Sequence, residues 1–203
     1  VEGLDVDADT VAYAAEKHGG PRCRFRLYEG RHLPYDTGTL DAVVSFQVIE
    51  HVQQDRSFVE EVARVLKPGG RFLLTTPNAA NRLRPGQRPW NRFHVREYRA
   101  SDLRALLAPV YRTVRLSGIV ATPEIMAMEA RRVRQSQRIV ALDPLNLRRC
   151  IPEGLKPLAT RLARKLIPAG RAADDRQPDW AERYTLENFS STEDDLDDCL
   201  DLL

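Results

Sequence analysis

The sequence has few cysteines, and it has no long apolar run. Its three cysteines, Cys23, Cys150 and Cys199, are odd in number and far apart, which argues against a disulfide framework or a zinc knuckle. No stretch approaches the roughly 20 apolar residues that cross a bilayer. The first residues are acidic, unlike the basic start of a secretory signal. We therefore expect a soluble, cytoplasmic protein without a membrane partner.

An excess of charge of one sign is also lacking. The chain has 31 basic and 29 acidic residues, which leave a formal charge of +2, and only four of the basic residues are lysines. Basic residues gather between 131 and 171, and acidic residues gather between 173 and 203. We interpret these blocks as solvated faces. The alternative is that the basic block binds nucleic acid, but we do not expect nucleic acid to be a partner.

With 203 residues, 42% of them hydrophobic, the chain is long enough for one α/β domain. In the first half, apolar strands alternate with amphipathic helices, which is typical of βαβ units and a parallel sheet. The segment 41–46 is short, apolar and β-branched, and this predicts a central strand buried on both faces. The remaining predicted elements of this half are strands at 1–5, 25–28 and 71–76 and helices at 9–18 and 57–66.

The second half of the sequence is less regular. Residues 79–98 form an expected loop with arginine, proline and aromatic residues, and Ser101 is a good N-cap for a helix through Leu107. A strand is expected at 111–119 and a last strand at 199–203. Between them we expect two or three helices over 123–167, interrupted by prolines, and a loop over 170–195.

Two acidic residues stand at the carboxyl ends of predicted strands, where the ligands of open α/β sheets bind. Asp5 ends the first strand, and a carboxylate there offers acceptors for both hydroxyls of a ribose. Glu29 ends the next strand; its carboxylate could accept from an adenine amino group, while the Gly30 amide donates to the ring. The alternatives are a strand-end cap at Asp5 and an ordinary turn at Glu29.

Four segments in order carry a family resemblance: Gly-Leu-Asp at 3–5, Glu-Gly-Arg-His-Leu-Pro at 29–34, the segment 40–52, and the segment 64–78 with its Leu-Lys-Pro-Gly-Gly turn. Together they resemble the class I S-adenosylmethionine-dependent methyltransferases, most closely the subgroup of the ubiquinone-biosynthesis O-methyltransferases. The resemblance covers residues 1 to about 119. It implies a doubly wound, Rossmann-like, mostly parallel sheet with a helical insertion near the C-terminus.

The resemblance also implies a site for S-adenosylmethionine at the ends of three strands. Its residues are Asp5 at the ribose, Glu29 and Gly30 at the adenine, and Phe46 and Gln47 at the methionine part and the methyl group, with Val6 and Arg31 as further cofactor-binding residues.

The family's glycine-rich loop has no counterpart in the sequence, which starts within the family's second strand. We therefore expect a core that lacks the first strand and this loop, and a clipped last strand. The expected division is a methyltransferase core at 1–122, a helical insertion or substrate cap at 123–190, and a return to the sheet at 191–203.

A second group of residues suggests the chemistry. Gln-Val-Ile-Glu-His occupies 47–51, and His94 follows in the arginine-rich loop. In some relatives a Glu-x-x-Glu-His segment and a later histidine bind a divalent metal. Gln47 replaces the first glutamate, so we do not favour a metal here. Without one, His51 or His94 would act as a general base next to Glu50. The alternative is that Glu50 and His51 cap a helix entrance, while His94 shapes the substrate loop.

The resemblance implies methyl transfer from S-adenosylmethionine to a small-molecule acceptor, most simply to an oxygen. Three alternatives stay open: a degenerate methyltransferase-fold module or fragment without activity, an RNA methyltransferase, and a nicotinamide-dependent oxidoreductase. The Glu-His-Val and Leu-Lys-Pro-Gly-Gly segments argue against the last. The sequence leaves the acceptor and the oligomeric state open.

Overall fold

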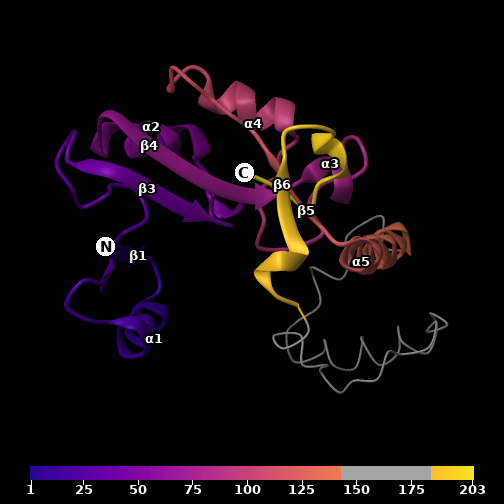
Figure 1. The fold of residues 1–203 in the computed structure, drawn as a ribbon, viewed down its shortest axis with the longest axis horizontal. Helices are drawn as coiled ribbons and strands as arrows, with labels where there is room; N and C mark the ends of the chain where they lie inside the picture. Colours follow the sequence, from indigo (N-terminus) through magenta and orange to yellow (C-terminus); the bar gives the residue numbers. More distant parts are fainter. Residues whose placement is uncertain (143–183) are drawn as a thin grey trace.

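A computed structural model describes residues 1–142 and 184–203, and it contains two β-sheets flanked by helices (Figure 1). The N-terminal sheet has two parallel strands joined by one helix, in which Asp5 of the first strand stands opposite Leu27 of the second. This unit consists of β1 (Glu2–Asp5), α1 (Ala8–His18) and β2 (Arg24–Leu27). It corresponds to one of the βαβ units that the sequence pattern predicts.

The second sheet has five strands in the order β3-β4-β7-β5-β6. β3 and β4 are parallel, whereas β7 is antiparallel to both β4 and β5, and β6 is antiparallel to β5. β3, β4 and β5 therefore share one direction within a mixed sheet. The strands are β3 (Leu40–Phe46), β4 (Leu66–Pro77), β5 (Gly118–Ala121), β6 (Phe189–Thr192) and β7 (Asp201–Leu202).

Helices connect and flank these strands. They are α2 (Asp55–Val65), α3 (Ala79–Arg82), α4 (Ala100–Leu107) and α5 (Pro123–Leu142), with short 3-10 turns η1 (Ile49–His51), η4 (Leu186–Asn188) and η5 (Leu196–Asp198). Among the helices that the structure describes, none has the length and apolar character needed to cross a membrane.

The helix ends show which local signals were informative. Asp7 caps α1, because its Oδ2 accepts from the backbone N–H of Thr10 at 2.8 Å. The hydrogen bond from the Thr10 hydroxyl and this backbone bond both lower the pKa of Asp7. At α4 the expected cap is wrong. The helix begins at Ala100, so Ser101 lies inside its first turn, and Asp102 instead accepts from the backbone N–H of Arg99.

The core lies between one face of the β3–β4 pair and the helices α2 and α4. α2 buries Val59, Val62 and Val65 completely, as its 3.6-residue period predicts. The main cluster joins residues from both helices and the sheet: Ile49, Val59, Leu74, Tyr98, Leu103, Leu107, Leu116 and Leu202. This packing fixes the C-terminal ends of β3 and β4.

The prediction that β3 is buried on both faces is wrong. β3 lies at the edge of its sheet, with β4 as its neighbour. Val44 and Leu73 are partners across the ladder and are 56% and 45% exposed, and Phe46 is 57% exposed. Successive strand residues point to opposite faces, so only the face of Val43 and Leu74 reaches the core.

Other boundaries differ in the second half. The strand expected at 111–119 is confined to β5, which starts at Gly118, and the loop expected at 170–195 contains β6. The expected helices beyond Leu142 lie outside the described residues. The proposed domain boundaries at 122/123 and 190/191 stay predictions.

Replacing Gly118 by alanine is expected to lower the free energy of unfolding by about 1–3 kcal/mol, the usual cost of overpacking. A Cβ at this position would lie 1.9 Å from Sγ of Cys199, which is fully buried. Urea unfolding of the variant measures the loss. Gly20→Ala is the matched control, because its Cβ would meet nothing within 4 Å. Equal losses in the two variants would contradict the packing argument.

Candidate active site

The C-terminal ends of β3 and β4 hold a buried carboxylate. Glu50 lies on η1, is only 1% exposed, and accepts a hydrogen bond of 3.1 Å from the Thr76 hydroxyl at the end of β4. The backbone carbonyl of Glu50 accepts from the N–H of Val95 at 2.8 Å. This bond holds the loop that carries His94 against η1, so residues far apart in sequence meet here.

His51 and His94 lie next to this carboxylate. Their rings meet edge to face, with centroids 4.8 Å apart. Nδ1 of His51 is 3.0 Å from the carbonyl oxygen of Phe93, and Nδ1 of His94 is 2.7 Å from Oε1 of Glu97. A carbonyl and a carboxylate only accept, so in a neutral ring Nδ1 carries the hydrogen and Nε2 keeps its lone pair. Each histidine is therefore oriented as a base or a metal ligand.

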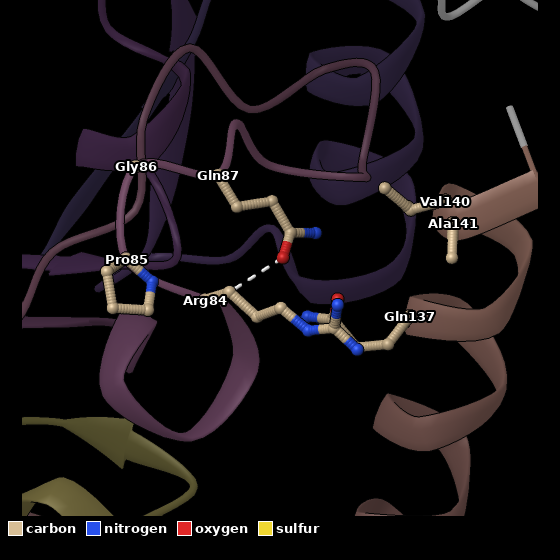
Figure 2. A pocket seen from close by; sticks show the side chains of 7 residues that line it. All are labelled: Arg84, Pro85, Gly86, Gln87, Gln137, Val140 and Ala141. Atoms are coloured by element: carbon tan, nitrogen blue, oxygen red, sulfur yellow. Dashed lines mark hydrogen bonds between the residues drawn. The ribbon is translucent and has the colours of Figure 1, made fainter. Parts of the chain in front are cut away.

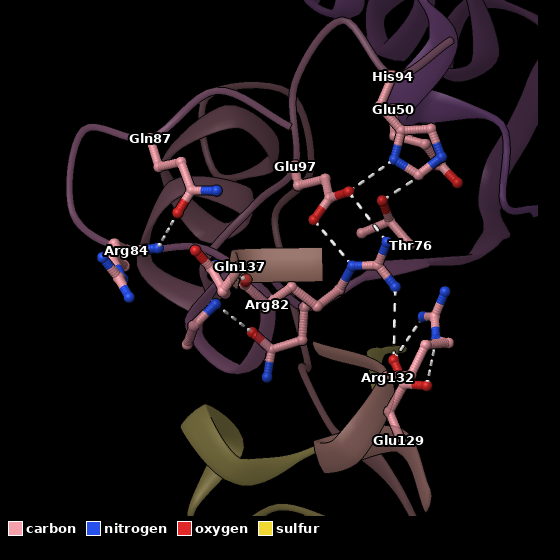
Figure 3. Close-up of polar contacts among 12 residues, drawn as sticks. Glu50, Thr76, Arg82, Arg84, Gln87, His94, Glu97, Glu129, Arg132 and Gln137 are labelled. Carbon is pink, nitrogen blue, oxygen red and sulfur yellow. Dashed lines mark hydrogen bonds and ion pairs between the residues drawn. The ribbon is translucent and has the colours of Figure 1, made fainter. Parts of the chain in front are cut away.

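Behind His94 lies a chain of ion pairs that links α3, the loop and α5 (Figure 3). The side chain of Glu97 is fully buried, and Arg82 donates to it from Nε at 3.0 Å and from Nη2 at 3.3 Å. Arg82 also lies 3.7 Å from Glu129 of α5, which pairs with Arg132. The guanidinium of Arg82 stacks over the ring of Trp90 at 4.8 Å. Glu97 thus serves Arg82 and His94 together.

Gln47 has a strained backbone at the end of β3. Its φ is 55°, which is uncommon outside glycine. Its backbone N–H donates to the Thr75 carbonyl at 2.9 Å, and its side-chain Nε2 donates to the Thr75 hydroxyl at 3.4 Å. Such strain persists only where the surroundings impose it, and it gathers at functional sites. The position expected to meet the methyl group is therefore structurally unusual.

Asp201→Asn is expected to increase stability at pH 7. Burial is the main cause that raises the pKa of Asp201, while Arg82 and Gln47 act against it. An acid whose folded pKa is raised destabilises the fold when ionised, and this penalty disappears as the pH falls through that pKa. Urea unfolding at pH 7 and at acid pH should show a gain that shrinks on acidification. The exposed Asp194→Asn is the control; a gain that does not depend on pH would contradict the prediction.

The residues expected at the ribose and adenine lie together at the ends of β1 and β2. Oδ1 of Asp5 accepts from the backbone N–H of Asp7 at 2.9 Å. Glu29 accepts from the backbone N–H of His32 at 2.5 Å. Gly30 has a φ of 84°, and a Cβ there would lie 3.2 Å from the exposed Val6. The backbone therefore approaches closely at this point, and glycine suits it.

The predicted site residues form two groups on two sheets. Asp5, Val6, Glu29 and Gly30 are close to one another, with Arg31 following on the exposed loop. Phe46, Gln47, Glu50, His51 and His94 belong to the end of the five-stranded sheet and its loop. Within the described part of the chain, no hydrogen bond or ion pair joins the first group to the second.

The residues that sequence reasoning missed are Glu97, Thr76, Glu129 and Asp201, and Arg82 was noted only as one of several loop arginines. The signal for Glu97 was weak: it follows His94 by three residues and is an acid among arginines. Asp201 and Glu129 reach the site through folding alone, since they come from β7 and α5. No local pattern marks them.

The donor set of Glu50, His51 and His94 suits a divalent cation by its chemistry. One ligand atom from each lies within 4.8 Å of the others, and two imidazoles with one carboxylate are a known zinc ligand set. Glu50 would supply the anionic oxygen and the histidines their Nε2 atoms, and a cation so held would orient and acidify an acceptor hydroxyl. Gln47 is uncharged and supplies no second negative oxygen.

Comparison with known proteins relates the chain to methyltransferases. Residues 1–74 match the methyltransferase domain family. A probable S-adenosylmethionine-dependent methyltransferase of Mycolicibacterium smegmatis is 44% identical over 108 residues, which are 53% of this chain and 41% of the relative. One of Mycobacterium tuberculosis is 37% identical over 130 residues, which are 63% of this chain and 47% of the relative. The chain spans about half the length of the curated relatives it matches.

A solved structure shows the fold. A protein of Bacillus halodurans C-125 that has been assigned as a methyltransferase has a TM-score of 0.50 at 17% identity, over 69% of this chain and 66% of that one. The fold is therefore the Rossmann-like α/β fold of class I methyltransferases, as the sequence predicts. The matched domain is a methyltransferase domain, and the relatives are named as S-adenosylmethionine-dependent enzymes. This similarity supports S-adenosylmethionine as the cofactor.

Proposed function

We propose that the chain transfers the methyl group of S-adenosylmethionine to a hydroxyl oxygen of a small-molecule acceptor. The observation that carries the proposal is the pair His51 and His94, whose Nδ1 atoms face acceptors so that both Nε2 atoms keep their lone pairs beside buried Glu50. The proposal includes a relation of this chain to the ubiquinone-type O-methyltransferases, and the Gln47–His51 segment supports that relation.

The N-terminal sheet would bind the nucleoside part of the cofactor. Oδ1 of Asp5 is held by a backbone N–H, which leaves Oδ2 for the ribose hydroxyls. Glu29 and Gly30 would meet the adenine at the end of β2. Phe46 and Gln47 would meet the methionine part; Phe46 is exposed at the end of β3 and offers an apolar surface.

His94 is the better of the two candidate bases. S-adenosylmethionine supplies an activated methyl group, so the protein has chiefly to align the acceptor and take its proton. The acceptor oxygen forms the new bond to carbon, the electron pair of the broken bond stays on sulfur, and Nε2 of His94 takes the hydroxyl proton. The buried carboxylate of Glu97 at Nδ1 stabilises the imidazolium that results.

Asp5→Asn is expected to weaken binding of S-adenosylhomocysteine about 10- to 100-fold. Hydrogen bonds to a charged group contribute about 1.5–3 kcal/mol, and asparagine has one acceptor where aspartate has two. Calorimetric titration of the whole chain measures the change, with NADH as the control ligand. Asp9→Asn in the first turn of α1 removes the same charge outside the proposed site.

The titration also tests the proposed function itself. We expect micromolar binding of S-adenosylhomocysteine and none of NADH by the wild-type chain. Binding of neither ligand by a chain that circular dichroism shows to be folded would favour the non-catalytic module. Equal weakening by Asp5→Asn and Asp9→Asn would contradict the ribose role of Asp5.

A further inference from the structure

A hollow with a volume of about 280 Å³ lies between the loop that follows α3 and the C-terminal part of α5 (Figure 2). Arg84 and Gln87 reach it from the loop, and Gln137 and Val140 reach it from the helix. Its size is at the lower limit for ligand sites, so it suits one functional group with a short apolar stem rather than a whole cofactor. None of the proposed catalytic or cofactor residues lines it.

Gln87 is held in one orientation and leaves a donor unused. Its side-chain Oε1 accepts from the backbone N–H of Arg84 at 3.1 Å, and the backbone N–H of Gln87 donates to the Arg84 carbonyl at 3.0 Å. Gly86, with a φ of 73°, makes this tight turn possible. Nε2 of Gln87 is buried and has no hydrogen-bond partner. A buried donor without a partner is costly, which points to an acceptor that the hollow receives from outside.

The charge of the hollow is positive. Arg84 points its guanidinium toward Gln137 at the edge of the hollow (Figure 2), and no ion pair of the described residues neutralises it. No acidic residue belongs to the lining, whose other members are Pro85, Gly86 and the small apolar side chains of α5. An anion that accepts hydrogen bonds and carries a short apolar stem therefore fits both parts of this surface.

We propose that this hollow binds a carboxylate of the methyl acceptor, with Arg84 and the Nε2 donor of Gln87 as its partners. A planar carboxylate offers two acceptor atoms, which matches the fork of a guanidinium and a neighbouring amide. The stem of the acceptor would then pass along Pro85 and Val140. The assignment to a methyl acceptor rests on the proposed function, whereas anion binding does not.

The contacts around the hollow connect it to the proposed base. Nε2 of Gln137 donates to the backbone carbonyl of Arg82 at 2.6 Å, and the Arg82 side chain holds Glu97, which in turn holds His94 (Figure 3). The anion site and the base are therefore built on one rigid set of contacts. An acceptor anchored by its carboxylate here would present a second group toward His94.

The test is binding of hexanoate to the full chain, compared with hexanamide, which has the same shape without the charge. We expect hexanoate to bind in the millimolar range or tighter, and hexanamide at least tenfold more weakly. Side-chain amide resonances in two-dimensional NMR should show the signal of Gln87 moving on addition of hexanoate. Arg84→Gln should weaken hexanoate at least fivefold, whereas the exposed Arg88→Gln, with the same change of charge, should alter it less than twofold.

A second variant keeps the test independent of folding. Gln87→Glu retains the oxygen that accepts from Arg84 and replaces the free donor by a negative oxygen, so hexanoate binding should fall at least tenfold in a variant that circular dichroism shows to be folded. Equal binding of hexanoate and hexanamide, equal losses in the Arg84 and Arg88 variants, or tighter binding of inorganic phosphate than of hexanoate would each overturn the proposal. Failure with hexanoate while S-adenosylhomocysteine binds would leave the proposed function intact. If hexanoate binds and S-adenosylhomocysteine does not, the anion site stands, but its assignment to a methyl acceptor fails.

Discussion

Glu97→Ala is expected to lower the free energy of unfolding by about 3–5 kcal/mol, the usual cost of removing one partner of a buried ion pair. The Glu97 side chain is fully buried, and it accepts from Arg82 and from His94. Without it, the guanidinium of Arg82, itself only 10% exposed, stays in the interior with Glu129 at 3.7 Å as its nearest remaining partner. Urea unfolding followed by circular dichroism measures the loss.

Two further variants make this prediction specific. Glu60→Ala removes a carboxylate that pairs with Arg56 on the exposed surface of α2, and we expect a loss of about 0.5 kcal/mol or less. The double variant Glu97→Ala, Arg82→Ala removes both buried charges, so its loss should be smaller than the sum of the two single losses. A loss below about 1 kcal/mol for Glu97→Ala would show that water reaches this pair.

The local elements of the first half could be predicted because their signals lie within the elements themselves. α1 and α2 were expected within two residues of their observed limits, since apolar periodicity marks both and a capping aspartate marks the start of α1. Asp5 and Glu29 were expected at strand ends, and both β1 and β2 end there or nearby. The spacing of the motifs was sufficient to place Asp5 and Glu29, because a single βαβ unit positions both residues.

Burial of a strand could not be predicted in the same way, because it depends on what covers each face. Most residues of β3 are apolar, and they lie on both faces of the strand, which is the pattern of a central strand. In the structure Val44 and Phe46 are more than half exposed, while Ser45 is buried with its hydroxyl unpaired. The residue types of a strand show that either face could be buried. They do not show which face the neighbouring helices cover.

The polar contacts of the site were the least predictable part. His94 was singled out by its type, yet the groups that orient it come from the following turn, from α3 and from α5. Gln137 is 55 residues from Arg82, and its contact needs the packing of α5 against the loop. Such pairs carry no sequence period, so only the folded chain brings them together.

His94→Gln is expected to lower the rate of methyl transfer about 10²- to 10⁴-fold, the range for a positioned general base. Glutamine keeps a hydrogen-bonding group near Glu97 and cannot take a proton, so affinity for S-adenosylhomocysteine should change less than twofold. Release of S-adenosylhomocysteine with a panel of phenolic acceptors measures the rate. His18→Gln, at the exposed end of α1, is the control.

The outcomes of this experiment separate the base from the metal. If EDTA leaves the wild-type rate unchanged and His94→Gln removes it, the free Nε2 acts as the base. If EDTA abolishes the rate and a divalent cation restores it, Glu50, His51 and His94 act as ligands instead, since their donor atoms already lie within 4.8 Å of one another. A variant rate within twofold of wild type would contradict both roles. His94 would then act only through its contact with Glu97, and its replacement would change stability rather than turnover.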